Sequence, residues 1–370
     1  MHWFLAILIL PYLVLILIIY KGLLKIKPFT PASPASIKVS VVIACRNEQD
    51  NLPKILRDLD NQEYLTSLLE IIIVDDNSSD GTFNVASSFR NKFRLTVLKN
   101  TGTGKKQALR TGIHASSGDL IITTDADCRA GKRWIAAIAS FYERNKPDLI
   151  LCPVRSEGGT GFFGQFAELE FLSLQGITAG TALLKKAVMC NGANLSFTRE
   201  TYDKHSPYLH DEIASGDDIF LLHSIKKVAG TNIEWLESEE AMVLTAIPGS
   251  LKKFLRQRKR WISKWTDYKD SFTISVGIVT FVTILAQSAL CVASLTNIRF
   301  LTVTTLVFIL KSIPDYLVLK NTTSRYSCNR LMKWFIPSQL VYPFYVITVA
   351  VISLFGNKKN EVSFPSPKGT

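Results

Sequence analysis

The chain has 370 residues, of which 47% are hydrophobic, and it carries a formal net charge of +12. This apolar content is high for a soluble protein, so we expect membrane segments, and the charge favours anionic lipid, an anionic substrate or nucleic acid as a partner. The six cysteines form no Cys-x-x-Cys pair and have no histidines at zinc spacing. This spacing argues against a zinc site and fits a reducing, cytoplasmic environment for the polar part of the chain.

The first apolar segment has no charged residue from Trp3 to Tyr20, and Lys21, Lys25 and Lys27 follow it at once. This length is enough to cross a bilayer. A cleaved signal peptide normally carries its positive charge before the apolar run, whereas here the charge comes after it. We therefore predict a retained transmembrane anchor over residues 1–21, whose C-terminal end is cytoplasmic by the positive-inside rule.

Short apolar strands alternate with helices in the next part of the chain. The pattern predicts strands over 38–45, 71–74, 95–98 and 120–124, with helices from Leu52 and over 107–113. Strand-helix-strand order is typical of an α/β, Rossmann-like domain with a parallel sheet. Such sheets bind ligands beyond the carboxyl ends of their strands, which is where Asp75, Asp76, Asp125 and Asp127 fall.

Asp125 and Asp127 follow directly on the predicted strand over 120–124. Alternate residues of an extended chain point the same way, so both carboxylates can converge on one point. They repel each other unless a cation joins them, and hard oxygen ligands suit Mg²⁺ or Mn²⁺ carried in with a phosphate. The alternative is a solvated turn, because Asp-x-Asp is a short and common sequence.

Two further loops carry charged residues whose role the sequence leaves undecided. Asp217 and Asp218 precede a predicted helix over 219–228, where either can cap the helix or serve a site. The loop over 102–106 contains Gly102, Gly104 and Lys105, but it lacks the Walker spacing and the Ser or Thr after the lysine. This loop is therefore either a basic loop near a phosphate or a solvated turn.

A basic amphipathic helix is predicted over residues 249–269, and apolar segments over 272–295, 300–319 and 334–355 follow it. Such a helix lies in the membrane interface, with its cations toward anionic headgroups. The apolar segments make the membrane a better partner than nucleic acid. Lys311 and Asp315 lie four residues apart within the middle segment, so we expect them to form an ion pair. Two prolines break the last segment, which we interpret as re-entrant.

An ordered set of motifs in this sequence resembles the motifs of family 2 glycosyltransferases. The motifs are residues 39–48, the Asp75–Asp76 turn with 78–82, residues 104–112, Asp125-Ala126-Asp127, residues 191–194, Gly216-Asp217-Asp218, and Gln257, Arg260 and Trp261 in Q-x-x-R-W spacing. The resemblance covers about residues 37 to 268. The membrane layout is similar to that of cellulose, hyaluronan and ceramide-glucose synthases.

The resemblance implies a GT-A domain over residues 37–236 that uses a nucleotide-diphosphate sugar and Mg²⁺ or Mn²⁺. It implies that Asp218 is the general base, with Asp217 beside it, and that Asp127 and Asp125 hold the metal. Arg260 would bind the donor diphosphate, and Trp261 would position donor and acceptor. The implied donor-binding residues are Arg46, Glu48, Asp75, Asp76, Lys105, Asp125, Gln257, Arg260 and Trp261. The implied acceptor-binding residues are Asn191, Gly192, Asn194 and Trp261.

One carboxylate on the acceptor side, with no covalent partner, implies an inverting displacement. Processive members usually have Glu-Asp or Thr-Glu-Asp where this chain has Gly216-Asp217-Asp218, which leaves Asp218 in place. With about three C-terminal segments over 272–355, a polymer channel would need a partner subunit or a homo-oligomer. We therefore expect a multi-pass enzyme of the plasma membrane, with its catalytic domain in the cytoplasm. We expect it to transfer a sugar to a lipid or lipid-linked acceptor in cell-envelope glycan synthesis, and the expected donor is a UDP-sugar.

The alternatives are a processive polysaccharide synthase, a nucleotidyl- or phosphotransferase, and a membrane scaffold without activity. The sequence does not identify the sugar or the acceptor, because sugar hydroxyls are read by scattered polar contacts rather than by motifs.

Overall fold

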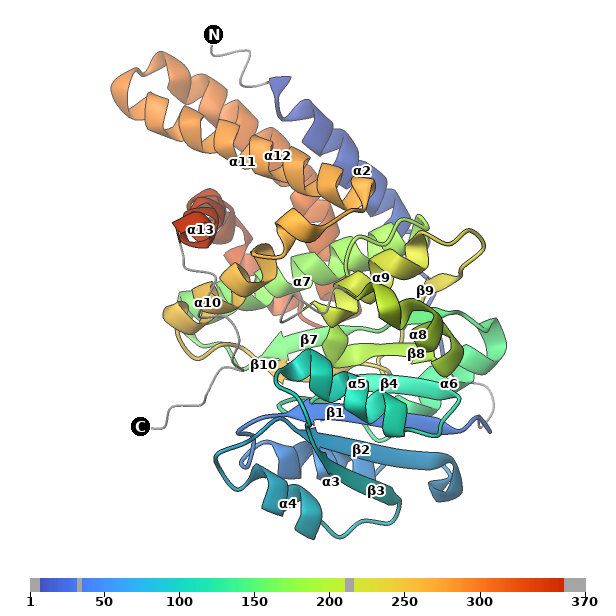
Figure 1. Ribbon diagram of the computed structural model, residues 1–370. Helices are drawn as coiled ribbons and strands as arrows, with labels where there is room; N and C mark the ends of the chain where they lie inside the picture. The colour runs from blue at the N-terminus through green and yellow to red at the C-terminus, as the bar shows by residue number, and fades with distance from the viewer. Residues whose placement is uncertain (1–6, 32–34, 210–215, 356–370) are drawn as a thin grey trace. The chain divides into compact units, whose positions relative to one another are not determined.

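The computed structural model describes residues 7–31, 35–209 and 216–355 (Figure 1). The chain divides into two compact units, each of which is described by itself. The sheet unit takes in residues 27–155 and 189–246, within the described ranges. The helical unit takes in residues 7–26, 156–188 and 247–355, within the described ranges.

A seven-stranded sheet forms the centre of the sheet unit, in the order β3-β2-β1-β4-β8-β6-β9. The first four strands of this order are parallel to one another, whereas β8 runs antiparallel to both β4 and β6. The strands are β1 (Val39–Cys45), β2 (Leu69–Asp75), β3 (Arg94–Lys99), β4 (Leu120–Asp125), β6 (Leu149–Leu151), β8 (Leu195–Thr198) and β9 (Ile233–Trp235). The predicted α/β domain with parallel strands is thereby confirmed.

Helices and a small second sheet complete the unit. The helices are α3 (Leu52–Asp60), α4 (Thr82–Ser88), α5 (Lys105–Ala115), α6 (Trp134–Asn145), α8 (Arg199–His205) and α9 (Asp217–Lys226). The second sheet has the order β5-β10-β7, with β5 (Arg129–Ala130), β7 (Val154–Glu157) and β10 (Val243–Ala246).

Strands β1 and β2 are buried along their whole length, as expected of short apolar runs in a parallel sheet. Helix α5 packs on these two strands, and Figure 1 shows it running along the sheet. Gly112 of α5 allows this close approach, because a Cβ atom there would lie 2.5 Å from Val42 Cγ1. The packing fixes the start of α5 near the ends of these strands.

The chain order of the parallel strands changes direction at β1. Strands β2 and β3 follow on one side of β1, and β4 lies on its other side. Ligands of open α/β sheets bind beyond the carboxyl ends of the strands at such a switch point. Asp75 pairs with Cys45 in register, and Asp125 pairs with Ala44, so the two aspartates flank the end of β1.

Among the residues that the structure describes, the helical unit contains three helices long and apolar enough to cross a membrane, at Ser271–Thr296, Arg299–Arg325 and Asn329–Leu354. They correspond to the three predicted C-terminal segments. The helices of this unit are α2 (Leu10–Leu23), α7 (Gly161–Leu183), α10 (Leu251–Ile262), α11 (Ser271–Thr296), α12 (Arg299–Arg325) and α13 (Phe335–Phe355).

The predicted N-terminal anchor corresponds to α2, which is a 14-residue apolar helix within the described residues. Residues 1–6 of the predicted anchor lie outside the described residues. Helix α2 packs on α7 and α12. Gly22 makes the α7 contact tight, because a Cβ atom there would lie 2.1 Å from the carbonyl oxygen of Gly180. Small residues at a helix contact allow the two backbones to approach closely.

Lys311 and Asp315 form the predicted ion pair inside the helical unit. Lys311 is only 1% exposed, and its Nζ donates to Asp315 Oδ2 at 2.7 Å and to Gln339 Oε1 at 3.2 Å. The Tyr12 hydroxyl of α2 donates to the other carboxylate oxygen of Asp315 at 2.6 Å. Three helices therefore share one buried polar cluster.

Reversing one charge of this pair is expected to destabilise the helical unit strongly. Lys311→Asp and Asp315→Lys each place two like charges one helical turn apart, and breaking a buried pair costs about 3–5 kcal/mol. The double swap should recover part of that loss in thermal unfolding of the detergent-purified protein. Arg299→Asp, at the exposed start of α12, is the control. A double swap no more stable than either single variant would contradict the pairing.

Two details of the sequence interpretation are corrected. Helix α10 ends at Ile262, short of the predicted residue 269. Helix α13 continues through Pro343 without a break.

Candidate active site

The loops after β1 and β2 are tied together by side chain to backbone hydrogen bonds. The Glu48 N–H donates to Thr82 Oγ1 at 2.7 Å, and the Asn47 N–H donates to Ser78 Oγ at 2.9 Å. In return, Asn47 Oδ1 accepts from the Ser79 N–H at 2.8 Å. These hydrogen bonds therefore hold the two loops together at the edge of the sheet beside the switch point.

Asp75 and Asp76 are both buried at the end of β2, with exposures of 3% and 0%. Asp76 accepts hydrogen bonds from Asn100 Nδ2 at 2.6 Å and from the Gly104 N–H at 2.9 Å, and Arg46 lies 3.9 Å away. Asp76 therefore holds the loop that leads into α5. Asp75 accepts from the Ser78 N–H through Oδ2, whereas its buried Oδ1 has no hydrogen-bond partner among the described residues.

Lys105, at the start of α5, donates a hydrogen bond to Asp125 Oδ1 at the end of β4. Partial burial alone would lower the pKa of Lys105, but the carboxylates of Asp125, Asp217 and Asp218 outweigh it and raise the pKa above its usual value. The ammonium group therefore stays charged at neutral pH. Asp127 is exposed beside this pair, and desolvation together with the Asp125 carboxylate raises the pKa of Asp127.

Two carboxylates at this edge fit the donor chemistry of Mg²⁺ or Mn²⁺. No cluster of three or more His, Cys, Asp or Glu side chains that could hold a metal occurs in the ranges 7–31, 35–209 and 216–355. A hard cation that shares its coordination with a diphosphate needs only one or two protein carboxylates. Because Asp125 already bonds to Lys105, Asp127 is the residue better placed to bind such a cation, and Asp125 would assist.

Glu48 lies at the same edge of the sheet, where burial raises its pKa to about 7. The hydrogen bond from Asn51 Nδ2 to Glu48 Oε2, at 2.9 Å, acts in the opposite direction, and the carboxylates of Asp127, Asp125 and Asp80 reinforce the rise. Glu48 is therefore only partly ionised at neutral pH when no cation is near.

Glu48→Gln is expected to stabilise the ligand-free protein increasingly as pH rises from 5 to 8. The folded-state pKa lies above the ordinary value, so wild-type stability falls as pH rises toward 7, whereas glutamine never ionises. After allowance for partial exposure, we expect a gain of about 1 kcal/mol, or about 2–4 °C in Tm, at the upper end. Glu200→Gln, at an exposed site of α8, is the control. A Tm difference independent of pH would contradict the account.

Asp217 and Asp218 are the first two residues of α9, after Gly216 at the N-cap position, so neither is itself the N-cap residue. Asp218 Oδ2 instead accepts from the Gly192 N–H at 3.0 Å, and its Oδ1 accepts from the Ile219 N–H at 2.8 Å. The carbonyl oxygen of Gly192 accepts from Thr123 Oγ1 of β4 at 2.9 Å. Asp218 is thereby linked through Gly192 to the strand that ends in Asp125.

Asn194 has a structural role that differs from the predicted acceptor contact. It has no exposed surface, its amide donates to the carbonyl oxygens of Pro153 and Ala241 at 2.8 Å each, and its Oδ1 accepts from Trp134 Nε1 at 3.0 Å. Both N–H groups of its amide are therefore used inside the protein, and no part of the side chain is exposed to a ligand. Asn191 accepts from the Ala193 N–H at 3.0 Å and shapes the turn that presents Gly192.

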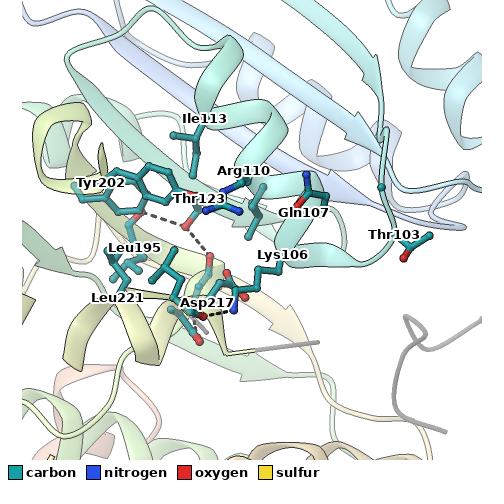
Figure 2. Close-up of a pocket in the computed structure, with 16 residues that line it drawn as sticks. Thr103, Lys106, Gln107, Arg110, Ile113, Thr123, Leu195, Tyr202, Asp217 and Leu221 are labelled. Carbon is teal, nitrogen blue, oxygen red and sulfur yellow. Dashed lines mark hydrogen bonds between the residues drawn. The ribbon is translucent and has the colours of Figure 1, made fainter. Parts of the chain in front are cut away.

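A pocket of about 270 Å³ lies beside Asp217 and Asp218 within the sheet unit. Figure 2 shows side chains of α5, among them Lys106 and Arg110, on one side of it and Tyr202 and Leu221 on the other. Lys106 donates to the carbonyl oxygen of Leu209. The pocket offers a small space with polar groups and apolar walls next to the two aspartates.

The remaining predicted site residues, Gln257, Arg260 and Trp261, lie on α10 in the helical unit. The sheet unit by itself brings together two groups of predicted residues. Around the end of β2 lie Arg46, Glu48, Asp75 and Asp76. Around the ends of β4 and the start of α9 lie Lys105, Asp125, Asp127, Asp217, Asp218, Asn191 and Gly192.

Sequence reasoning missed two residues that hold the site. Thr123 sits inside a buried strand, where its hydroxyl binds the Gly192 carbonyl, and Asn100 follows β3 and binds Asp76. Thr123 gave a usable signal, because a buried hydroxyl in an apolar strand needs a partner. For Asn100, the only sequence signal of a role in the site is its position just after a predicted strand.

The fold of the sheet unit is an α/β domain of the GT-A type, with carboxylates at the ends of its parallel strands. Residues 40–206 match the family model described as Glycosyl transferase family 2. The chain is 28% identical over 243 residues to the probable glycosyltransferase YdaM of Bacillus subtilis, which covers 60% of this chain and 54% of YdaM. It is also 28% identical over 185 residues to the glycosyltransferase AglE of Haloferax volcanii, which covers 48% of this chain and 58% of AglE.

The chain therefore spans somewhat more than half the length of these two curated relatives. Among solved structures, it resembles the mannosyltransferase PcManGT from Pyrobaculum calidifontis, which is described in complex with GDP-Man and Mn²⁺. The TM-score is 0.61 at 18% identity, over 97% of this chain and all of the other. At this identity the likeness concerns the fold.

Proposed function

We propose that this chain is a membrane-bound, inverting glycosyltransferase. It moves a sugar from a nucleoside-diphosphate sugar to a lipid or lipid-linked acceptor in cell-envelope glycan synthesis. The donor that we propose is a UDP-sugar. The observation that carries the proposal is the gathering of Asp75, Lys105, Asp125 and Asp218 at one edge of the sheet. The glycosyltransferase family 2 match to residues 40–206 supports it.

The donor half of the site suits a nucleoside diphosphate. The buried, unpartnered Oδ1 of Asp75 is a strong acceptor for an N–H or O–H group of the nucleoside. The charged Lys105 suits the diphosphate, and Asp127 and Asp125 would hold the metal. A divalent cation, when bound, neutralises the diphosphate as it departs. We assign Arg46, Glu48 and Asp76 to the rim that shapes this half.

The acceptor half of the site centres on Asp218. Its carboxylate is oriented by the Gly192 N–H and can accept the proton of an acceptor hydroxyl. The acceptor oxygen then bonds to the anomeric carbon while the bond from that carbon to the diphosphate oxygen breaks. Because a single displacement occurs on the face opposite the leaving group, the configuration inverts.

The membrane part of the proposal rests on the helical unit. Three of the helices described in this unit are long and apolar enough to cross a membrane. Exposed Leu251, Lys252, Lys253 and Arg256 give α10 the mixed surface of an interfacial helix. We assign Gln257, Arg260 and Trp261 of this helix to the donor and acceptor, the catalytic domain to the cytoplasmic side, and the protein to the plasma membrane. A lipid acceptor suits an enzyme held at that surface.

The test is transfer of labelled sugar in membranes that contain the expressed chain. Because PcManGT is described with GDP-Man and Mn²⁺, GDP-mannose and Mn²⁺ are included beside UDP-sugars and Mg²⁺. Label in the organic extract, absent with Asp218→Asn, supports transfer to a lipid. Label in a long polymer would instead identify a processive synthase, and release of pyrophosphate rather than nucleoside diphosphate would identify a nucleotidyltransferase.

A further inference from the structure

Helix α10 buries one charged residue, Arg258, which is 4% exposed. Its Nε donates to Glu170 Oε1 of α7 at 3.0 Å, and a second guanidinium nitrogen donates to Glu170 Oε2. Glu170 is itself 8% exposed, and it also accepts from the Tyr345 hydroxyl of α13 at 3.0 Å. This two-pronged contact fixes both the position and the plane of the guanidinium group.

The same guanidinium group lies against two aromatic rings of its own helix. Its central carbon is 4.2 Å from the centre of the Trp261 ring and 4.5 Å from the centre of the Phe254 ring. Trp261 also contacts Phe171 of α7, with ring centres 6.4 Å apart. The indole therefore lies between the α7 surface and a guanidinium plane that Glu170 holds in place.

Helix geometry relates this anchor to the Q-x-x-R-W residues. At about 100° per residue, Gln257, Arg260 and Trp261 all lie on one flank of α10, within an arc of about 100° that begins about 60° from Arg258. None of the three can keep its direction if α10 rotates about its axis. The bond from Arg258 to Glu170 opposes that rotation.

We propose that Arg258 is a positioning residue for sugar transfer: through Glu170 and the Trp261 ring it fixes the rotational setting of α10. This inference rests on the proposed function, since it concerns the orientation of residues assigned to the donor and acceptor. Lysine cannot replace arginine here, because an ammonium group lacks the fork for Glu170 and the flat face for Trp261.

The test compares Arg258→Lys with the double variant Arg258→Met and Glu170→Met. Removing one partner of a buried pair costs stability, whereas removing both can leave it unchanged. We expect the double variant to keep its Tm while donor KM rises or kcat falls, so that kcat/KM drops about 10- to 100-fold. Arg258→Lys should show the same loss. Lys252→Met, in the exposed first turn of α10, is the control.

A folded double variant with wild-type kcat/KM would overturn the inference and leave the proposed function intact. If the wild type itself turned over no donor, the proposed function would fail, and the orientation of Trp261 would still be measurable. Acrylamide quenching, with each protein compared with its own Trp261→Phe version, reports on that residue alone. More quenching of Trp261 in the double variant is expected, and equal quenching would overturn the inference.

Discussion

Asp218→Asn is expected to abolish measurable sugar transfer while leaving donor binding and folding intact. The asparagine oxygen can still accept from the Gly192 N–H, so the start of α9 keeps its place. The amide cannot accept a proton from an acceptor hydroxyl, and loss of a general base lowers kcat by about 10²- to 10⁴-fold. Release of nucleoside diphosphate by the detergent-purified protein, with acceptor present, measures the effect.

The matched control is Asp203→Asn on α8. Asp203 is exposed in the same unit, so it tests the loss of one negative charge without touching the base. It should retain wild-type turnover. Full activity of Asp218→Asn would remove Asp218 from the mechanism and would favour Asp217, its neighbour on α9, as the base.

Asp127→Asn is the second large effect that we expect. Asp127 is exposed, and its Oδ1 accepts a hydrogen bond from Cys128 Sγ at 3.8 Å, so the substitution should not disturb folding. Asn keeps the shape and removes the charge that a divalent cation needs. We expect turnover to fall at least about 100-fold and the Mn²⁺ concentration for half-maximal activity to rise, since a metal supplies several kcal/mol of charge stabilisation.

Asp119→Asn is the control for this experiment, because Asp119 is exposed beside the opposite end of the same strand, β4. Asp125→Asn is less informative, since it also leaves Lys105 without its hydrogen-bond partner. A wild-type response of Asp127→Asn to Mn²⁺ would contradict the metal assignment. Activity of the wild type in the presence of a chelator would contradict metal dependence altogether.

The strand-edge residues were predictable from the sequence because the relation is local. A buried strand followed at once by Asp75 or by Asp125 places its carboxylate at a known edge of a parallel sheet. Lys311 and Asp315 were predictable for the same reason, since four residues make one helical turn. In each case the spacing along the chain decides the spacing in the fold.

Other features depend on segments that are distant in sequence. Asn194 belongs to a motif, but the carbonyl groups of Pro153 and Ala241 and the indole of Trp134 make it a structural residue. Arg258 looked like one more cation of a basic helix. Its burial depends on the hydrogen bond to Glu170, which lies 88 positions earlier in the sequence, so the sequence of the helix alone does not predict it. The partners of Asn194 and of Arg258 are not related to them by any periodic spacing in the sequence.

The most direct test of the central claim is release of nucleoside diphosphate from a panel of nucleotide sugars by the purified full chain. UDP- and GDP-sugars are supplied with Mn²⁺ or Mg²⁺, beside a chelator control and Asp218→Asn. We predict turnover of one donor that needs the metal and that Asp218→Asn abolishes. No turnover of any donor in the presence of membrane lipids, together with no binding of UDP or GDP, would contradict the claim that this chain transfers sugars.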